Sequence, residues 1–151
     1  MNRVRGKTAV ADAFFQLSQM APRVLVQRYI EWGHELLVGV QRDAKFGLVL
    51  ACGRGGTDVE QRADARFRLW PLDAADQDEL ASDVVASLPA RDAEERAALQ
   101  ATLVELLAAT SRLVAAHPTL QEADLNPVKL SAGDGAMVVD ARLRVSDNGS
   151  S

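Results

Sequence analysis

The segment that decides the fold is an apolar hairpin near the end of the chain, ADLNPVKLSAGDGAMVVDARLRV, which spans residues 123–145. Two apolar runs flank a short turn at residues 131–135 that contains Asp-Gly, a pattern typical of antiparallel hairpins. If Leu130 pairs with Ala136, the same register places Asn126 directly opposite Asp140. Cross-strand partners have Cβ atoms about 4.5–5.5 Å apart, so their side-chain oxygens could hold one divalent cation.

The same register pairs Asp124 with Arg142 and Glu122 with Arg144 on one face of the hairpin. The other face should pack on a helix; it carries Leu125, Pro127, Val139, Ala141 and Leu143. Taken by itself, the hairpin favours a simpler interpretation, a solvated face with two cross-strand ion pairs and no ligand, because exposed ion pairs are common. Pro127 shifts the balance slightly towards a ligand site, since proline suits an edge or interrupted strand.

Two helices are expected before this hairpin. Asp73 or Asp76 can cap a helix that runs to about Leu88. Asp92 followed by Glu95 has the spacing of a capping box at the start of a second, longer helix. An apolar stripe at helical spacing predicts that the longer helix faces the core; it comprises Leu99, Leu103, Leu106, Leu107, Thr110, Leu113 and Val114.

The first half of the chain predicts a short helix and then strands. Apolar residues at helical spacing indicate a helix over residues 9–21, ended by Pro22. Residues 24–30 are β-branched and aromatic, as in a buried strand. Further strands are expected at residues 35–41, 46–52 and 65–70, the last with arginines alternating with apolar residues. The order predicts an α+β domain, a mostly antiparallel sheet with helices on one face.

We divide the chain into a helical lead-in at residues 1–23, the domain itself at residues 24–145 and a polar tail at residues 146–151. Its 151 residues are 48% hydrophobic with a net charge of −4, which suits one globular domain and disfavours a broad nucleic-acid surface. No signal peptide or membrane span is expected. A single cysteine fits a reducing, cytoplasmic setting, and two histidines exclude a multi-histidine metal site within the chain.

Gly53-Arg54-Gly55-Gly56 follows an apolar strand. Glycines allow backbone N–H groups to approach phosphate oxygens closely, but a plain glycine-rich turn explains the pattern equally well. Cys52, at the end of that strand, is expected to be a small buried residue rather than a nucleophile.

In order along the chain, five motifs resemble the ATP-grasp domain of NDP-forming acyl-CoA synthetases, the relatives of succinyl-CoA synthetase β subunits and ADP-forming acetyl-CoA synthetases. They cover roughly residues 9–145 and comprise VQRYI with HELLVGVQRD, FG at residues 46–47, GRGGTDVE, RLWPL, and the pair DLNP with VDAR. The resemblance implies the second lobe of an ATP-grasp fold. Arg54 and Ala44 depart from residues that are usual in the family.

The resemblance also implies residue roles. Asn126 and Asp140 resemble the Mg²⁺ ligands that bridge the phosphates of ATP. Gln27, Arg28, Tyr29 and Ile30 resemble the hinge that meets the adenine, and Glu35 an acid near the ribose or the phosphate-binding lysine. Gly55 and Gly56 belong to the glycine-rich strand-loop, which Glu60 closes. The phosphorylated histidine of the family belongs to a partner domain, and neither His34 nor His117 lies in a matching motif.

These roles imply partners. The first ATP-grasp lobe is expected upstream, and the CoA-binding and ligase domains in further domains or subunits. The function implied is the nucleotide- and Mg²⁺-binding part of an acid–CoA ligase that acts through phosphoryl transfer, with the chain alone expected to be inactive. The alternative is a non-catalytic or regulatory ATP-grasp-like remnant or assembly module, for example one associated with an acetyltransferase.

Overall fold

The computed structural model describes residues 4–55 and 64–146. The chain divides into two units, Met1–Glu31 and Trp32–Ser151. In the first unit, the expected helix is present as α1 (Lys7–Ser18), and none of its residues is buried. Phe15 of this helix is 67% exposed, and Met20, just beyond its end, is 82% exposed.

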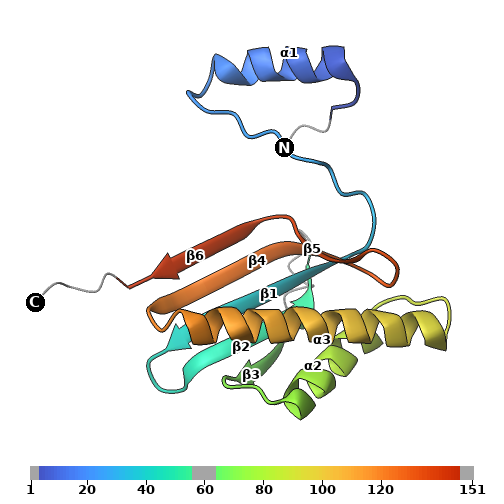
Figure 1. Cartoon of the computed structure of the whole chain (residues 1–151), viewed down its shortest axis with the longest axis vertical. Helices are drawn as coiled ribbons and strands as arrows, with labels where there is room; N and C mark the ends of the chain where they lie inside the picture. Colours follow the sequence, from blue (N-terminus) through green and yellow to red (C-terminus); the bar gives the residue numbers. More distant parts are fainter. Residues whose placement is uncertain (1–3, 56–63, 147–151) are drawn as a thin grey trace, which may run out of the picture. The chain divides into compact units, whose positions relative to one another are not determined.

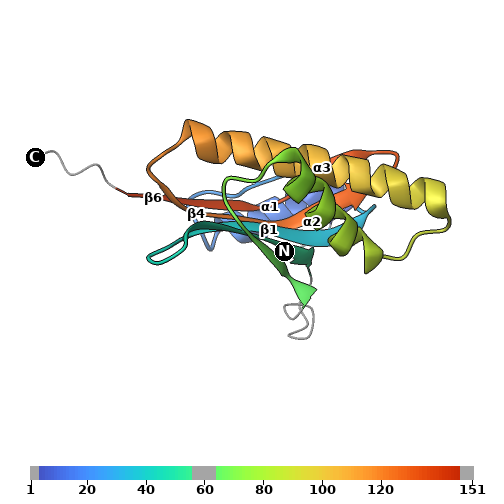
Figure 2. The same ribbon diagram turned by 90° about the horizontal axis from the view of Figure 1, so that it is seen from below.

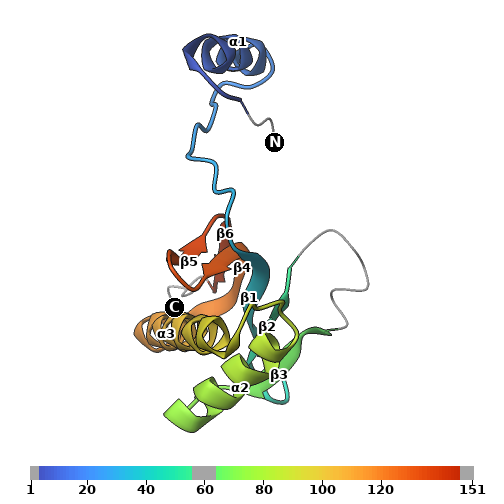
Figure 3. The same cartoon turned by 90° about the vertical axis from the view of Figure 1, so that its right-hand side faces the viewer.

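The second unit is a sheet with two helices. Its sheet is antiparallel throughout, with the strand order β3-β2-β1-β4-β5, and β6 also pairs with β4 (Figure 3). The elements are β1 (His34–Asp43), β2 (Gly47–Arg54), β3 (Arg66–Leu69), α2 (Ala74–Ala86), α3 (Ala93–Ala116), β4 (Leu120–Ser131), β5 (Gly135–Val138) and β6 (Ala141–Val145). The predicted α+β class, with helices on one face of a mostly antiparallel sheet, is confirmed.

Both helices lie across the same face of the sheet (Figures 1 and 2). They begin where the sequence indicates. The Asp73 carboxylate accepts the Asp76 backbone N–H at the start of α2, and the Asp92 carboxylate accepts the Glu95 backbone N–H at 2.8 Å at the start of α3. Such caps satisfy N–H groups that lack a partner in the first helical turn.

The core lies between these helices and the sheet. Alternate residues of the strands point into it, and from α3 it takes most of the predicted stripe. The fully buried members include Leu36 and Val38 of β1, Leu50 and Cys52 of β2, Leu99, Leu103 and Leu107 of α3, and Val128 and Leu130 of β4. By length and composition, α3 is the one helix among the described residues that could cross a membrane, but core helices pass the same test and its stripe lies in this core.

A β-bulge interrupts the pairing of β4 with β1. Leu36 pairs with Val128 and Val38 with Leu125, so Leu37 alone lies opposite both Asn126 and Pro127. Leu125 and Val128 are therefore both buried on the helix side, whereas Asn126 is exposed and Pro127 half-buried. The peptide bond between Asn126 and Pro127 is cis, as is that between Trp70 and Pro71.

Two sequence-based expectations are wrong. Residues 24–30 form no strand, and Leu25 is 82% exposed, because among the described residues no strand pairs with them. The second face of the terminal hairpin does not pack on the long helix throughout. All of β6 is exposed, Leu143 by 57%, and the bulge turns Pro127 away from the core.

The strand predicted at residues 65–70 is present as β3, and its arginines rather than its apolar residues face the helices. Arg68 forms ion pairs with Glu79 at 3.2 Å and Asp83 at 3.1 Å, both on α2. Phe67 and Leu69, which alternate with the arginines, are 62% and 57% exposed. Period two correctly predicts a strand here, but the burial of its two faces is the opposite of what the apolar pattern suggests.

Candidate functional site

The face of the sheet that the helices leave uncovered carries the polar residues of β1 and β4. Because opposed residues in an antiparallel ladder share a face, the register defines cross-strand rows on this open face. They are Gln41–Glu122–Arg144, Gly39–Asp124–Arg142 and Glu35–Lys129–Met137. The bulge, with Asn126 and Asp140, lies between the last two rows.

Asn126 and Asp140 are opposed as the hairpin register predicted. The Asn126 backbone N–H donates to the Asp140 carbonyl at 3.1 Å, and the Val139 N–H donates to the Pro127 carbonyl at 3.0 Å. Both site residues are exposed. They come together because the chain passes from β5 to β6 at the point where β4 bulges, so that β4 pairs with both strands in one continuous register.

The donor set at this point suits a hard cation. Carboxylate and amide oxygens are ligands of Mg²⁺, which proteins usually hold by one or two carboxylates together with phosphate oxygens. Within residues 4–55 and 64–146, no three His, Cys, Asp or Glu side chains are grouped to bind a metal ion by themselves. Asn126 and Asp140 therefore fit a cation that also takes ligands from a bound phosphate.

Glu35 lies in the next row and is held by a lysine. The Lys129 ammonium is 2.8 Å from Glu35 Oε1, and the side chain of Lys129 is only 13% exposed against 45% for Glu35. Gly55 is placed beside them, because its backbone N–H donates to the Glu35 carbonyl at 2.8 Å. A Cβ on Gly55 would lie 3.0 Å from the carbonyl carbon of Leu36, so this close approach of two backbones favours glycine.

The remaining predicted site residues lie elsewhere. Gln27, Arg28, Tyr29 and Ile30 belong to the first unit, where the first three are exposed and Ile30 is buried. Gly56 and Glu60 lie outside the described residues. The structure thus brings together, on one face, four of the predicted positions: Glu35, Gly55, Asn126 and Asp140.

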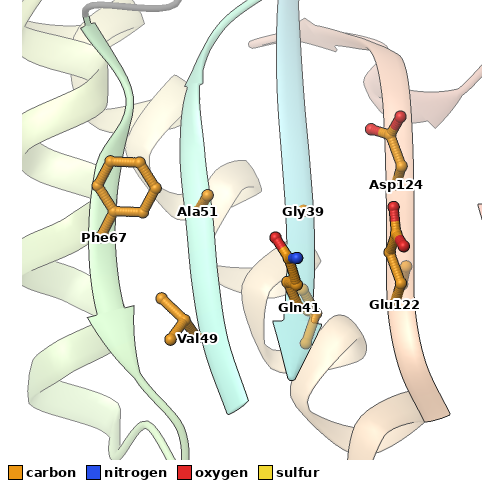
Figure 4. Close-up of a pocket in the computed structure, with 9 residues that line it drawn as sticks. Gly39, Gln41, Val49, Ala51, Phe67, Glu122 and Asp124 are labelled. Atoms are coloured by element: carbon orange, nitrogen blue, oxygen red, sulfur yellow. The ribbon is translucent and has the colours of Figure 1, made fainter. Parts of the chain in front are cut away.

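A hollow of about 190 Å³ on the open face involves residues that sequence reasoning did not single out. Gly39, which has no side chain, leaves space between Ala51 and Asp124, and Phe67 bounds the hollow on β3 (Figure 4). Gln41, Val49 and Glu122 also line it. The sequence signal for Phe67 is the alternation of arginine and apolar residues in β3. This alternation places Phe67 on the open face only once Arg68 is known to pair with α2.

Cys52 is not part of this face. Its side chain points into the core with no exposed area, and burial raises the pKa of its thiol to about 12. A thiol that stays protonated at neutral pH is a poor nucleophile, since the thiolate is the reactive form. The expectation that Cys52 is a buried structural residue is confirmed.

The sheet carries helices on one face and polar residues on the other, and a comparison with known families assigns it. Residues 4–145 match the family model described as the ATP-grasp domain. The chain belongs to this family, and its fold is a lobe of the ATP-grasp type.

The most similar curated relatives include ADP-forming acetate–CoA ligases. The chain is 36% identical over 148 residues to the ADP-forming acetate–CoA ligase I of Archaeoglobus fulgidus, which covers 91% of the chain but 22% of that protein. It is also 36% identical over 124 residues to the β subunit of ADP-forming acetate–CoA ligase II of Pyrococcus furiosus, covering 80% of the chain and 52% of the subunit. The chain therefore spans about a fifth of the first relative and half of the second.

Solved structures give the same assignment. The dinucleotide-forming acetyl-coenzyme A synthetase 1 of Ca. Korarchaeum cryptofilum, in complex with coenzyme A and Mg-AMPPCP, superposes with a TM-score of 0.77 at 26% identity, over 97% of this chain and 67% of that one. The ATP citrate lyase of Methanothrix soehngenii, at 16% identity and a TM-score of 0.58, shares the fold alone.

Proposed function

We propose that this chain is the nucleotide- and Mg²⁺-binding part of an NDP-forming acyl-CoA synthetase, an acid–CoA ligase that works by phosphoryl transfer. The observation that carries the proposal is the apposition of Asn126 and Asp140 on the exposed face of the sheet, at a bulge that frees them from the core. The identity to ADP-forming acetate–CoA ligases and the similarity to a structure solved with Mg-AMPPCP support it.

The residues predicted from the sequence have the following roles in this proposal. Asn126 and Asp140 would hold Mg²⁺ against the phosphates of ATP. The bound cation neutralises phosphate charge that would otherwise repel an attacking nucleophile. Glu35, fixed by Lys129 yet still 45% exposed, can accept a further hydrogen bond from the nucleotide. Gly55, Gly56 and Glu60 of the glycine-rich segment would complete the phosphate side.

The partners proposed are the upstream ATP-grasp lobe and the CoA-binding and ligase domains of the synthetase. The exposed apolar residues of the first unit support the first of these. Leu25 is 82% and Val26 66% exposed in a segment whose β-branched composition suits a strand, so it would gain a partner in an adjoining sheet. We place the adenine-binding hinge, Gln27 to Ile30, in that same segment. A cytoplasmic location belongs to the proposal and is supported by the single, buried thiol.

The test replaces the charged metal ligand. In the chain assembled with an upstream ATP-grasp lobe, Asp140→Asn should abolish the Mg²⁺-dependent part of the rise in melting temperature caused by Mg-ATP, without changing the melting temperature of the unliganded protein. Loss of residues that merely support a metal ligand costs roughly 10–100-fold in metal affinity, so a direct ligand should cost at least as much. The measurement is thermal unfolding with ATP in the presence of Mg²⁺ or of EDTA.

Asp134→Asn is the matched control, because it removes the same charge from the exposed turn of the same hairpin. It should leave the Mg²⁺-dependent shift intact. If the assembled wild-type protein shows no Mg²⁺-dependent shift at all, the nucleotide-binding role fails and the alternative of a non-catalytic assembly module takes its place.

A further inference from the structure

Three cationic residues flank the predicted metal ligands on the open face: Lys129, Arg142 and Arg144. Two of them are neutralised within the fold. Lys129 Nζ is 2.8 Å from Glu35, and Arg144 Nε is 3.1 Å from Glu122. Throughout the described part of the chain, no carboxylate lies within ion-pair distance of Arg142.

The absence of an ion pair at Arg142 is notable because an acid lies next to it. Asp124 is its direct partner in the β4–β6 register, just as Glu122 is the partner of Arg144 one row away. Asp124 instead lines the hollow beside Gly39 (Figure 4). Two rows with the same pairing chemistry therefore differ, and Arg142 is exposed with no carboxylate of the described residues paired to it.

Arg142 is also the cation closest in register to Asp140. The two residues are two apart along one chain segment, so their side chains share a face and are separated by roughly 6.8 Å along the strand. A flexible arginine side chain can cover such a span. An anion bound to a cation at Asn126 and Asp140 would thus lie within reach of the Arg142 guanidinium.

We propose that Arg142 is a phosphate-contacting residue, whose guanidinium donates to oxygens of the terminal phosphates of the nucleotide bound at Asn126 and Asp140. The proposal rests on the proposed function. A planar guanidinium can donate two parallel N–H bonds to a phosphate, and such charge-assisted bonds are among the strongest in proteins. The contact is electrostatic; Arg142 neither forms nor breaks a covalent bond, but it stabilises charge on the transferring phosphoryl group.

The experiment compares Arg142→Gln with Arg144→Gln in the chain assembled with an upstream ATP-grasp lobe. Dissociation constants are measured by equilibrium titration for Mg-AMPPCP and for AMP, which lacks the terminal phosphates. Arg142→Gln should weaken binding of Mg-AMPPCP by about tenfold or more while leaving AMP binding within about twofold. Arg144→Gln should leave both within about twofold, because its guanidinium is already taken by Glu122.

Equal effects of the two glutamine variants, or unchanged Mg-AMPPCP affinity in Arg142→Gln when Asp140→Asn weakens it, would overturn the role of Arg142 but leave the proposed function standing. If Asp140→Asn also leaves the affinity unchanged, the proposed function fails and the inference with it.

If Arg142→Gln lowers the melting temperature of the unliganded protein, the comparison is repeated with Arg142→Lys and Arg144→Lys, which retain the charge. Loss of Mg-AMPPCP affinity at position 142 alone supports the two-pronged contact, and no loss at that position overturns it.

Discussion

At the residue scale, glycines decide how closely the backbones of this sheet can approach. Gly53, at the end of β2, faces the residue that leads into β3, and a Cβ there would lie 2.7 Å from the Cα of Ala65. Gly133, in the turn of the terminal hairpin, has open space instead. Neither has a positive φ, so the difference between them is steric.

We predict that Gly53→Ala destabilises the domain whereas Gly133→Ala does not. At Gly53 the clash is with backbone, which cannot rotate away, so β2 and β3 must separate. The expected loss in the free energy of unfolding is about 1–3 kcal/mol, as for other overpacked sites. Gly133→Ala should change it by less than about 0.5 kcal/mol. Urea denaturation of both variants checks the difference, and equal midpoints would contradict it.

Residue identities alone also gave the position of Asn126 opposite Asp140, because the Asp-Gly turn sets the register of the hairpin. The sequence did not reveal the bulge. Pro127 has the parity of a core residue, and only the pairing of Leu36 with Val128 and of Val38 with Leu125 shows that two residues of β4 occupy one position. A bulge depends on a neighbouring strand that is distant in sequence, so local alternation cannot reveal it.

At the element scale, α3 is the most strongly specified part of the chain. Its cap, its apolar stripe and its end near His117 all follow from local sequence, and the structure places the helix at Ala93–Ala116. Glu95 supports the same cap from the other side, because its carboxylate accepts the backbone N–H of Arg91 at 2.6 Å. That hydrogen bond holds the pKa of Glu95 below its usual value.

We predict that Asp92→Ala lowers the free energy of unfolding by about 1 kcal/mol, the usual cost of losing an N-cap side chain. The cause is a first-turn N–H, that of Glu95, which loses its acceptor. Glu105→Ala is the control, since it removes the same charge from an exposed position further along α3. Thermal unfolding of both variants measures the difference. An equal loss in the two would mean that charge, rather than capping, is responsible.

Strands were harder to predict than helices, for a physical reason. Residues 24–30 have strand composition, yet a strand is stable only when it is paired, and nothing in the described residues pairs with them. In β3, Arg68 faces the helices and forms ion pairs with Glu79 and Asp83 of α2, which are distant from it in sequence. Both outcomes depend on partners outside the segment.

At the scale of the whole molecule, the residues predicted to bind the nucleotide come from both units of the chain. The predicted metal ligands Asn126 and Asp140 lie in the second unit together with Glu35, and the predicted hinge residues Gln27 to Ile30 lie in the first. The open face of the sheet is exposed, and all the residues that line its hollow belong to the strands. The second unit alone therefore supplies only part of the contacts predicted for a nucleotide.

We predict that Mg-ATP raises the melting temperature of this chain only weakly by itself and clearly once an upstream ATP-grasp lobe is supplied. Stabilisation by a ligand grows with its concentration relative to its dissociation constant, reaching about 2.7 kcal/mol at a hundredfold excess. One lobe without the other should bind Mg-ATP with a high dissociation constant, so the rise in melting temperature should be small. Thermal unfolding at one fixed Mg-ATP concentration compares the two states, and equal shifts would show that the chain binds the nucleotide unaided.

The two-for-one step at Asn126 and Pro127 has a consequence for divergence within the family. The bulge shifts the inward–outward alternation of β4 by one residue, because Leu125 and Val128 are both buried although they are three positions apart. Replacing Asn126 and Pro127, which lie between them, would leave the packing of the core unchanged. Descendants of this domain can thus abandon or retune cation chemistry while their overall architecture stays intact, so shape alone is a poor guide to which of them remain active.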